Sequence, residues 1–305
     1  MSNSRALDKF CLVLWTLFLL AVPFYFLGKE PVSNAGAMNR SLKGAMQAKV
    51  EGGVPQVADY VMMALMALVV GGFGLLLLPR HLPVAHAFGA FVCYVAVVNL
   101  VWTLVTGDLR ILKNTLFYVY DYLLLLTLLA LYARLGEKFL RVTVHATAAS
   151  VFLQVILSPI APDTSSFRNA LFFNNANQLG HYAAMAATLF YLGSKRFPMQ
   201  VAYQACFYLA VVYLNLLCLS KAALLGGAVL LVFVLLQRPA LLVTAVGAGA
   251  LLLAGAVLAK SASLEVITNL EQRITTREAD ESWATRGWDR IANHPELLLL
   301  GAGAG

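Results

Sequence analysis

The sequence has too few charged residues to cover the surface of a soluble protein of its length. Only 12% of its 305 residues are Asp, Glu, Lys or Arg, whereas 60% are hydrophobic and the mean hydropathy is +0.76. In soluble domains about a quarter of the residues are charged. This shortage excludes a soluble globule and predicts a polytopic membrane protein. The net charge of +7 is ordinary for such a protein and gives no reason to expect nucleic acid as a partner.

Several signatures of metal, disulfide and nucleotide sites are also missing. The five histidines never stand at His-x3-His spacing, and the four cysteines show neither pairing nor a Cys-x-x-Cys motif. The cysteines lie in or beside apolar runs, so we expect them to be small buried side chains. They are Cys11, Cys93, Cys206 and Cys218. No glycine-rich phosphate loop stands between a strand and a helix. We therefore expect neither a metal nor another cofactor.

The long hydrophobic runs predict about nine membrane-spanning helices, since about 20 apolar residues cross the hydrocarbon core. Lipid offers the backbone no hydrogen-bond partners, so each span must be a helix in the absence of the period-two alternation of a barrel. The expected spans are approximately 9–28, 58–78, 84–106, 111–132, 139–160, 175–193, 199–219, 221–236 and 240–259. The first run is expected to be retained, because no cleavage site of small residues follows it.

Cations in the short loops predict the orientation of these spans. With the N-terminus in the cytoplasm, seven Lys or Arg residues lie in inner loops and four in outer loops, as the positive-inside rule favours. The inner residues are Arg80, Arg134, Lys138, Arg141, Lys195, Arg196 and Arg238, and the outer ones are Arg110, Lys113, Arg168 and Lys221. We expect a transmembrane domain over residues 1–259. Residues 260–305 then form an outer segment with a short amphipathic helix, whose Trp283 and Trp288 are typical of a membrane interface.

Polar side chains are concentrated in one otherwise apolar stretch, residues 168–181. It holds Arg168, Asn169, Asn174, Asn175, Asn177, Gln178 and His181. A polar group buried without a partner costs a few kcal/mol, so these groups must face water or bind something. The amides at the start of the sixth expected helix can cap its free backbone N–H groups or bind sugar hydroxyls. Four amides are more than one cap needs.

Cations from distant parts of the sequence fall on the same expected outer face. Arg168 follows the fifth span, Lys221 lies at a tight turn between the seventh and eighth, and Arg286 and Arg290 lie in the tail. Each could extend to the lipid headgroups by itself. Lys221, however, has almost no loop around it, and a cation at depth costs about 2.5–3.5 kcal/mol. A pocket of such cations suits a phosphate-bearing, lipid-linked substrate, because arginine forks onto phosphate oxygens and lysine acts as a point charge.

These residues carry a resemblance to the O-antigen ligase and polymerase superfamily of bacterial polytopic membrane glycosyltransferases. The stretch RNALFFNNAN, residues 168–177, resembles the family pattern R-x-x-G-x-F-x-N-P-N. The matching residues are Arg168, Phe173, Asn175 and Asn177, while Leu171 replaces the glycine and Ala176 the proline.

Two further elements follow in the family's order. SKAA, residues 220–223, resembles an S-R-small-small turn that opens a helix, with Lys221 in place of the arginine. A final Arg, Trp and P-x4-G-x-G element is similar to Arg286, Trp288, Pro295, Gly301 and Gly303. The resemblance covers roughly residues 168–305, and the first five spans match only as apolar helices.

The resemblance implies an all-α, GT-C-like fold in the bacterial inner (plasma) membrane, with a periplasmic active face. It implies transfer of a glycan from undecaprenyl diphosphate to an acceptor glycan such as lipid A–core in lipopolysaccharide biosynthesis. The partners are then the lipid-linked donor, the acceptor and the membrane lipid, with no cofactor. Under this resemblance the residues that act in catalysis are Arg168, Lys221 and Arg286, and those that bind substrate are Asn175, Asn177, His181 and Arg290.

Two alternatives stay open. An O-antigen or exopolysaccharide polymerase would use the same kind of donor but pass the glycan to another lipid-linked repeat, and nothing in these residues separates it from a ligase. A lipid-glycan transporter would show two similar halves or broken helices with polar residues at the midplane. Here the polar residues gather at one face, and no internal repeat is found.

One departure from the family concerns the general base. The family takes a histidine that is thought to be catalytic from a segment after its G-x-G element, whereas this sequence ends at Gly305. A missing general base typically costs about 10²–10⁴-fold in rate. We therefore expect the chain as given to bind the lipid diphosphate and to transfer glycan weakly or not at all.

Overall fold

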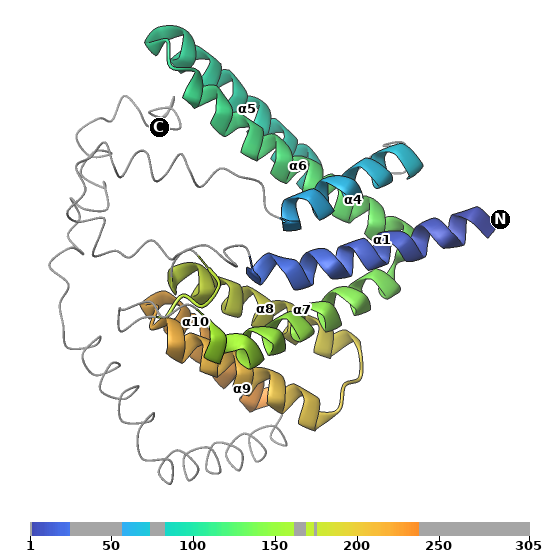
Figure 1. Ribbon diagram of the computed structural model, residues 1–305, viewed down its shortest axis with the longest axis vertical. Helices are drawn as coiled ribbons and strands as arrows, with labels where there is room; N and C mark the ends of the chain where they lie inside the picture. Colours follow the sequence, from blue (N-terminus) through green and yellow to red (C-terminus); the bar gives the residue numbers. More distant parts are fainter. Residues whose placement is uncertain (1, 25–56, 74–82, 162–168, 174–175, 238–305) are drawn as a thin grey trace, which may run out of the picture. The chain divides into compact units, whose positions relative to one another are not determined.

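The computed structural model describes residues 2–24, 57–73, 83–161, 169–173 and 176–237, and these are helical apart from the segment 169–173 and short turns between helices. In this part of the chain no strand is found (Figure 1). The α-helices are α1 (Ser2–Ala21), α4 (Val57–Phe73), α5 (Pro83–Thr106), α6 (Leu109–Leu135), α7 (Glu137–Leu157), α8 (Ala176–Arg196), α9 (Val201–Cys218) and α10 (Lys221–Gln237). Two 3-10 helices, η1 (Val22–Phe24) and η3 (Ser158–Ile160), extend α1 and α7.

Each of the first eight expected spans overlaps one of these α-helices, although α1 begins at Ser2 rather than at residue 9. Positions 25–28 of the first span, positions 74–78 of the second and the whole ninth span, 240–259, lie outside the described residues. Five described stretches are long and apolar enough to cross a membrane, which indicates a multi-pass membrane protein. They are Ala6–Phe24, Pro83–Thr106, Asn114–Leu135, Glu137–Ile160 and Val201–Cys218. The apolar stretches of α4 and α10 are shorter, and α8 begins and ends with polar residues. Spans beyond these five therefore stay predictions.

The described helices form two compact units. The hairpin unit contains α5, α6 and α4 from Met63 onward, and the bundle unit contains α1 from Asp8 onward with α7, α8, α9 and α10. The expected outer segment, 260–305, lies outside the described residues.

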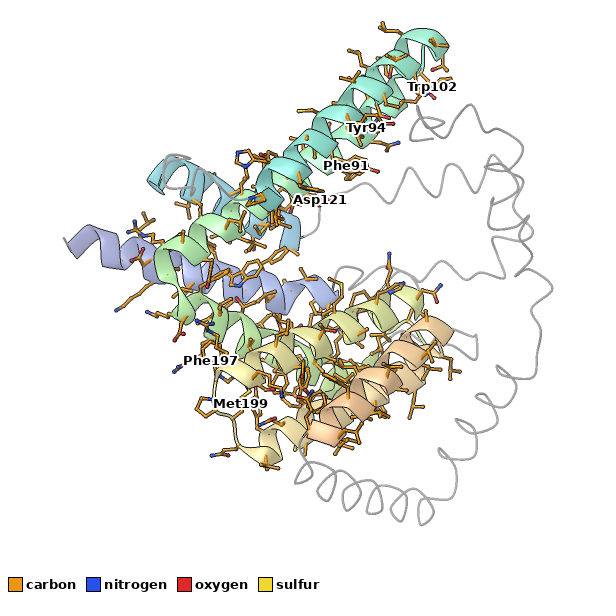
Figure 2. The ribbon with its side chains drawn as sticks, turned by 180° about the vertical axis from the view of Figure 1, so that it is seen from behind. Phe91, Tyr94, Trp102, Asp121, Phe197 and Met199 are labelled. Carbon is orange, nitrogen blue, oxygen red and sulfur yellow. The ribbon has the colours of Figure 1, made fainter. Side chains whose placement is uncertain are left out.

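The hairpin unit is built on an antiparallel pair, α5 and α6, that lie side by side in Figure 1. Gly107 turns the chain between them with a φ of 72°, and its N–H donates to the Thr103 carbonyl over 2.8 Å. Asn99 Nδ2 donates to Thr115 Oγ1 across the pair. Figure 2 labels Phe91, Tyr94 and Trp102 along α5 and Asp121 on α6.

The surface of this hairpin is mostly apolar and exposed. Leu104 on α5 and Phe117 on α6 are 76% and 69% exposed. On a soluble protein an exposed apolar surface of this kind would bind another protein or aggregate. In a membrane it contacts lipid chains, which are as apolar as the side chains themselves. Exposed apolar faces of this kind are typical of membrane-spanning helices, in agreement with the two candidate spans in this unit.

In the bundle unit, neighbouring helices along the chain alternate in direction. Arg196 at the end of α8 binds Glu137 at the start of α7, so these two helices are antiparallel. Ser158, just after α7, lies 3.0 Å from the Tyr213 hydroxyl near the end of α9, so α7 and α9 run the same way. The core between the helices contains Phe190 of α8, whose ring stacks on Phe207 of α9 at 3.9 Å between centroids.

Because of this alternation the bundle unit has two chemically different ends. We call one the basic end, which holds Glu137, Lys138 and Arg141 of α7, Lys195 and Arg196 of α8, and Gln237 of α10. We call the other the amide end, which holds the segment Asn169–Phe173, the first turns of α8 and α10, and the α9–α10 turn at Leu219 and Ser220.

Two hydrogen bonds connect helix α1 and the 3-10 helix after it to α7 within the bundle unit. Trp15 Nε1 donates to Thr143 Oγ1 over 2.8 Å, and Gln154 Nε2 donates to the carbonyl of Pro23 over 3.0 Å. The rings of Phe24 and Phe172 lie 5.0 Å apart and connect the end of η1 to the segment before α8. The side chains of Thr143 and Gln154 therefore face protein, which gives their polar groups hydrogen-bond partners that lipid would not offer.

The expectation of four buried cysteines is correct for two and wrong for two. Cys11 and Cys218 are buried, whereas Cys93 on α5 and Cys206 on α9 are exposed, and none of the four forms a disulfide in the structure. In a membrane helix an apolar side chain gains little from burial inside the protein, because lipid is as apolar as the protein core. An apolar setting in the sequence therefore does not separate an inward from an outward cysteine.

Candidate functional site

The turn between α9 and α10 is short and fully packed. Leu219 follows α9 with a φ of 46°, in the left-handed region, and its N–H donates to the Asn215 carbonyl over 3.2 Å. The Leu224 N–H donates to the Ser220 carbonyl over 2.8 Å, so α10 starts at once. Leu219 and Ser220 are both buried. The tight turn predicted before Lys221 is therefore confirmed, and Lys221 is the first residue of α10.

The segment before α8 is a compact turn that rests on the end of α9. The backbone N–H of Asn169 donates to the Leu217 carbonyl over 2.9 Å. Asn169 Oδ1 accepts the N–H of Leu171 over 2.7 Å, which is an Asx turn. Leu171 has a φ of 47° and is buried, and the Phe173 N–H donates to the Ala170 carbonyl.

The first turns of α8 lie against the same α9–α10 turn. A Cβ on Gly180 would lie 2.6 Å from the Cβ of Ala223, 3.0 Å from Cys218 Sγ and 3.1 Å from the Cβ of Ser220. Only a glycine allows this approach. The amide end thus joins the segment Asn169–Phe173, the start of α8 and the start of α10 in one packed arrangement.

The predicted site residues differ in how the structure places them. Arg168, Asn175, Arg286 and Arg290 lie outside the described residues, and for Lys221 the backbone is described but not the side chain. Asn177 and His181 lie in the first turns of α8 and are both exposed. The structure thus brings the positions of Asn177, His181 and Lys221 to the same end of the bundle unit.

Asn177 and His181 lie on the outward face of α8, one helical turn apart. The exposed Met185 and Leu192 continue this face, while Gly180 and Ala187 lie on the buried side. The face is therefore polar at the amide end and apolar further along the helix.

Asn169 is a structural residue of this end that the sequence alone did not single out. Its pattern, an asparagine two residues before a residue with positive φ, is a signal for an Asx turn. A leucine at the positive-φ position hides that signal, because glycine is the usual residue there. Among the described residues, no three His, Cys, Asp or Glu side chains gather closely enough to hold a metal ion.

Comparison with known proteins finds no match for this chain, whether among family models, curated proteins or solved structures. The function therefore has to be argued from the residues and from the geometry of the amide end.

Proposed function

We propose that this membrane protein is an O-antigen ligase-like glycosyltransferase that binds an undecaprenyl-diphosphate-linked glycan at the amide end. The observation that carries the proposal is the hydrogen bond from Asn169 to Leu217. Asn169 follows Arg168 in the chain, and Leu217 stands four residues before Lys221. Arg168 and Lys221, which the sequence analysis assigns to one phosphate site, therefore stand close in the chain to two residues that are hydrogen-bonded to each other, Asn169 and Leu217.

Two helix N-termini at the amide end favour an anionic ligand there. Both α8 and α10 start at this end, and neither has an acidic residue in its first turn. The free backbone N–H groups and the dipole of each helix give its N-terminus about half a positive charge. Together with the charge of Lys221, they suit the diphosphate of a lipid-linked donor.

The backbone at Leu171 supports the family resemblance. Leu171 occupies the place of the glycine in the pattern R-x-x-G-x-F-x-N-P-N, and its φ of 47° lies in the region that favours glycine. The chain therefore adopts a glycine-like backbone conformation at this position, although the residue is leucine. A turn of the same kind in both would explain why the surrounding Arg and Asn positions match.

The outward face of α8 suits a ligand that is polar at one end and apolar along its length. Asn177 and His181 can donate to and accept from phosphate oxygens or sugar hydroxyls. Met185, two turns along from Asn177, is 73% exposed and continues the face with an apolar side chain. A polyprenyl diphosphate glycan has the same order, with a polar head beside a long apolar chain.

The proposed reaction is attack of an acceptor hydroxyl on the anomeric carbon of the donor glycan. A glycosidic bond to the acceptor forms, the bond from the anomeric carbon to the diphosphate breaks, and undecaprenyl diphosphate leaves with the electron pair. Arg168, Lys221 and Arg286 would stabilise the negative charge that grows on the leaving diphosphate, which is where positive charge contributes most. Asn175, Asn177, His181 and Arg290 would hold the substrate, and a general base would accept the hydroxyl proton.

The proposal is tested with the full chain in lipid nanodiscs and a labelled undecaprenyl-diphosphate glycan. We expect saturable donor binding that Lys221→Gln weakens, while Lys195→Gln at the basic end leaves it unchanged. Transfer of label to lipid A–core supports a ligase, and growth of the lipid-linked glycan supports a polymerase. Movement of the donor across the bilayer with no new glycosidic bond, or no donor binding at all, contradicts the proposal.

A further inference from the structure

The basic end of the bundle unit is the end at which two candidate membrane spans begin. The candidate spans Glu137–Ile160 and Val201–Cys218 both begin there, so their first residues mark the level at which the chain enters the apolar layer. Arg196 Nη2 lies 2.8 Å from Glu137 Oε1, which fixes the end of α8 at that level. The cations at the end of α8 are thus level with the first residues of the two candidate spans, where lipid headgroups are expected.

Positive charge exceeds negative charge at this end. The cations Lys138, Arg141, Lys195 and Arg196 outnumber the described carboxylates near this end, which are Glu137, engaged with Arg196, and Asp8 of α1. The guanidinium of Arg141 lies over the ring of Phe197, 5.1 Å from its centroid, and not in an ion pair with Glu137. A net positive surface at headgroup depth attracts anionic lipid.

Lys195 is held in a defined position rather than left to extend freely. Its ammonium donates to Gln237 Oε1 at the end of α10, and the same oxygen accepts the Tyr191 hydroxyl over 2.9 Å. The ammonium also lies 5.4 Å from the centroid of the Tyr191 ring. An ammonium has three N–H donors, so this arrangement leaves donors for an anionic oxygen. Holding the side chain in place beforehand lowers the entropy that binding would cost.

An apolar surface continues from Lys195 toward the middle of the bundle unit. Leu192 of α8 and Phe233 and Leu236 of α10 are exposed, and the Phe233 ring packs edge-on against Tyr191. A free phosphate ion has no apolar part that could contact such a surface. A phospholipid does, because its acyl chains can lie along these side chains while its phosphate meets Lys195.

We propose that Lys195, held by Gln237 and Tyr191, forms a headgroup-binding site for an anionic phospholipid at the α8–α10 edge of the basic end. The ligand class is a phospholipid with net negative charge, whose phosphate takes the ammonium and whose chains cover Leu192, Phe233 and Leu236. Arg196 adds positive charge nearby but stays paired with Glu137. This site is at the opposite end of the bundle unit from the proposed donor site.

The test uses the full chain in phosphatidylcholine nanodiscs, titrated with labelled phosphatidylglycerol. Lys195→Gln should weaken binding about fivefold, the effect of one cation near an anionic surface. Gln237→Glu should weaken it similarly, because a carboxylate would neutralise Lys195. Lys138→Gln removes the same charge at the same end and should have a much smaller effect, and Lys221→Gln at the amide end should have none.

Competition separates a lipid site from a phosphate site. Inorganic phosphate should not displace the labelled phosphatidylglycerol, because it lacks the acyl chains. Displacement by inorganic phosphate would overturn the assignment to lipid. Equal losses for Lys138→Gln and Lys195→Gln would show diffuse charge attraction and also overturn it, as would unchanged binding in Lys195→Gln. The side chains of Lys138, Lys195 and Gln237 are exposed, so variants at these positions should keep the elution profile and melting temperature of the parent protein.

Discussion

Gly180 of α8 and Ala223 of α10 approach so closely that a Cβ on the glycine would lie 2.6 Å from the Cβ of the alanine. Lipid gives helices no hydrophobic reason to associate, so close packing of small residues has to hold them together. This contact is at the amide end, where it seats the first turns of α8 against the α9–α10 turn. The geometry of the candidate site therefore depends on the absence of one methyl group.

Gly180→Ala should destabilise the bundle unit. The new methyl would overlap Ala223 and press on Cys218 Sγ, and overpacking of this kind costs about 1–3 kcal/mol. Gly226→Ala is the matched control, since a Cβ there meets nothing within 4 Å. It should be neutral or slightly stabilising, because alanine favours helix more than glycine does. Melting of the detergent-purified protein measures both, and equal melting temperatures would contradict the packing described here.

The Trp15–Thr143 hydrogen bond should contribute measurably to the attachment of α1. Interhelical hydrogen bonds in membrane proteins are worth about 0.6 kcal/mol on average, with values up to about 1.7. Trp15→Phe and Thr143→Val each remove one partner, and a double-mutant cycle isolates their coupling. We expect a positive coupling energy in that range from unfolding in mixed micelles. Strictly additive effects would show that the bond contributes nothing.

Most bounds of the described helices could be predicted to within a few residues because they follow from uninterrupted apolar runs, whereas α1 begins at Ser2, seven residues before the expected span. The eighth expected span began at residue 221, and α10 begins at Lys221. This agreement has a physical cause, since an apolar run in lipid must be helical for its backbone N–H and C=O groups to find partners. The number of spans could be predicted less well, because α8 has polar residues at both ends and α10 is short.

The interior contacts of the bundle unit could not be predicted from composition. Thr143, Ser150 and Gln154 look like isolated polar residues in an apolar run, yet they bind Trp15, the Tyr182 hydroxyl and the Pro23 carbonyl. The partners are separated by up to 131 residues, so no local pattern connects them. Of the candidate site, the sequence indicated the amide cluster and the tight turn before Lys221, but not the Asx turn of Asn169, since leucine stands where that turn favours glycine.

The two ends of the bundle unit should face opposite sides of the membrane. Asn177 near the start of α8 and Arg196 at its end are separated by the length of the helix, and both are exposed. In a background with Cys93→Ala and Cys206→Ala, which keeps only the buried Cys11 and Cys218, a cysteine introduced at position 177 or at position 196 can be labelled in intact cells. An impermeant reagent should label position 177, as the loop charges predict, and position 196 only after permeabilisation. Labelling of both positions in intact cells would contradict this orientation.

Binding of the lipid-linked donor should depend more on Arg168 than on Lys221. A guanidinium can hold two phosphate oxygens and an ammonium acts as a point charge. A hydrogen bond to a charged group contributes about 1.5–3 kcal/mol, so Arg168→Ala should weaken donor binding about tenfold or more. Arg168→Lys should cost much less, and Lys221→Arg should be neutral or beneficial because it restores the family's residue. Titration of labelled donor ranks the variants, and equal affinities for Arg168→Ala and the parent chain would remove Arg168 from the site.

Asn169→Asp separates the structural role of the Asx turn from the charge of the site. Aspartate presents the same acceptor to the Leu171 N–H, so the turn and the melting temperature should be retained. Asn169→Ala removes that acceptor and should lower the melting temperature, since a buried N–H left without a partner costs about 1–3 kcal/mol.

Donor binding should respond differently from stability. The carboxylate of Asn169→Asp would stand next to Arg168 in the chain and repel a diphosphate, so the donor affinity should fall although the fold is intact. Binding of a neutral lipid-linked glycan without the diphosphate should not fall with it. If Asn169→Asp binds the diphosphate donor as tightly as the parent chain does, no anion lies near the turn, and the donor site is not at the amide end.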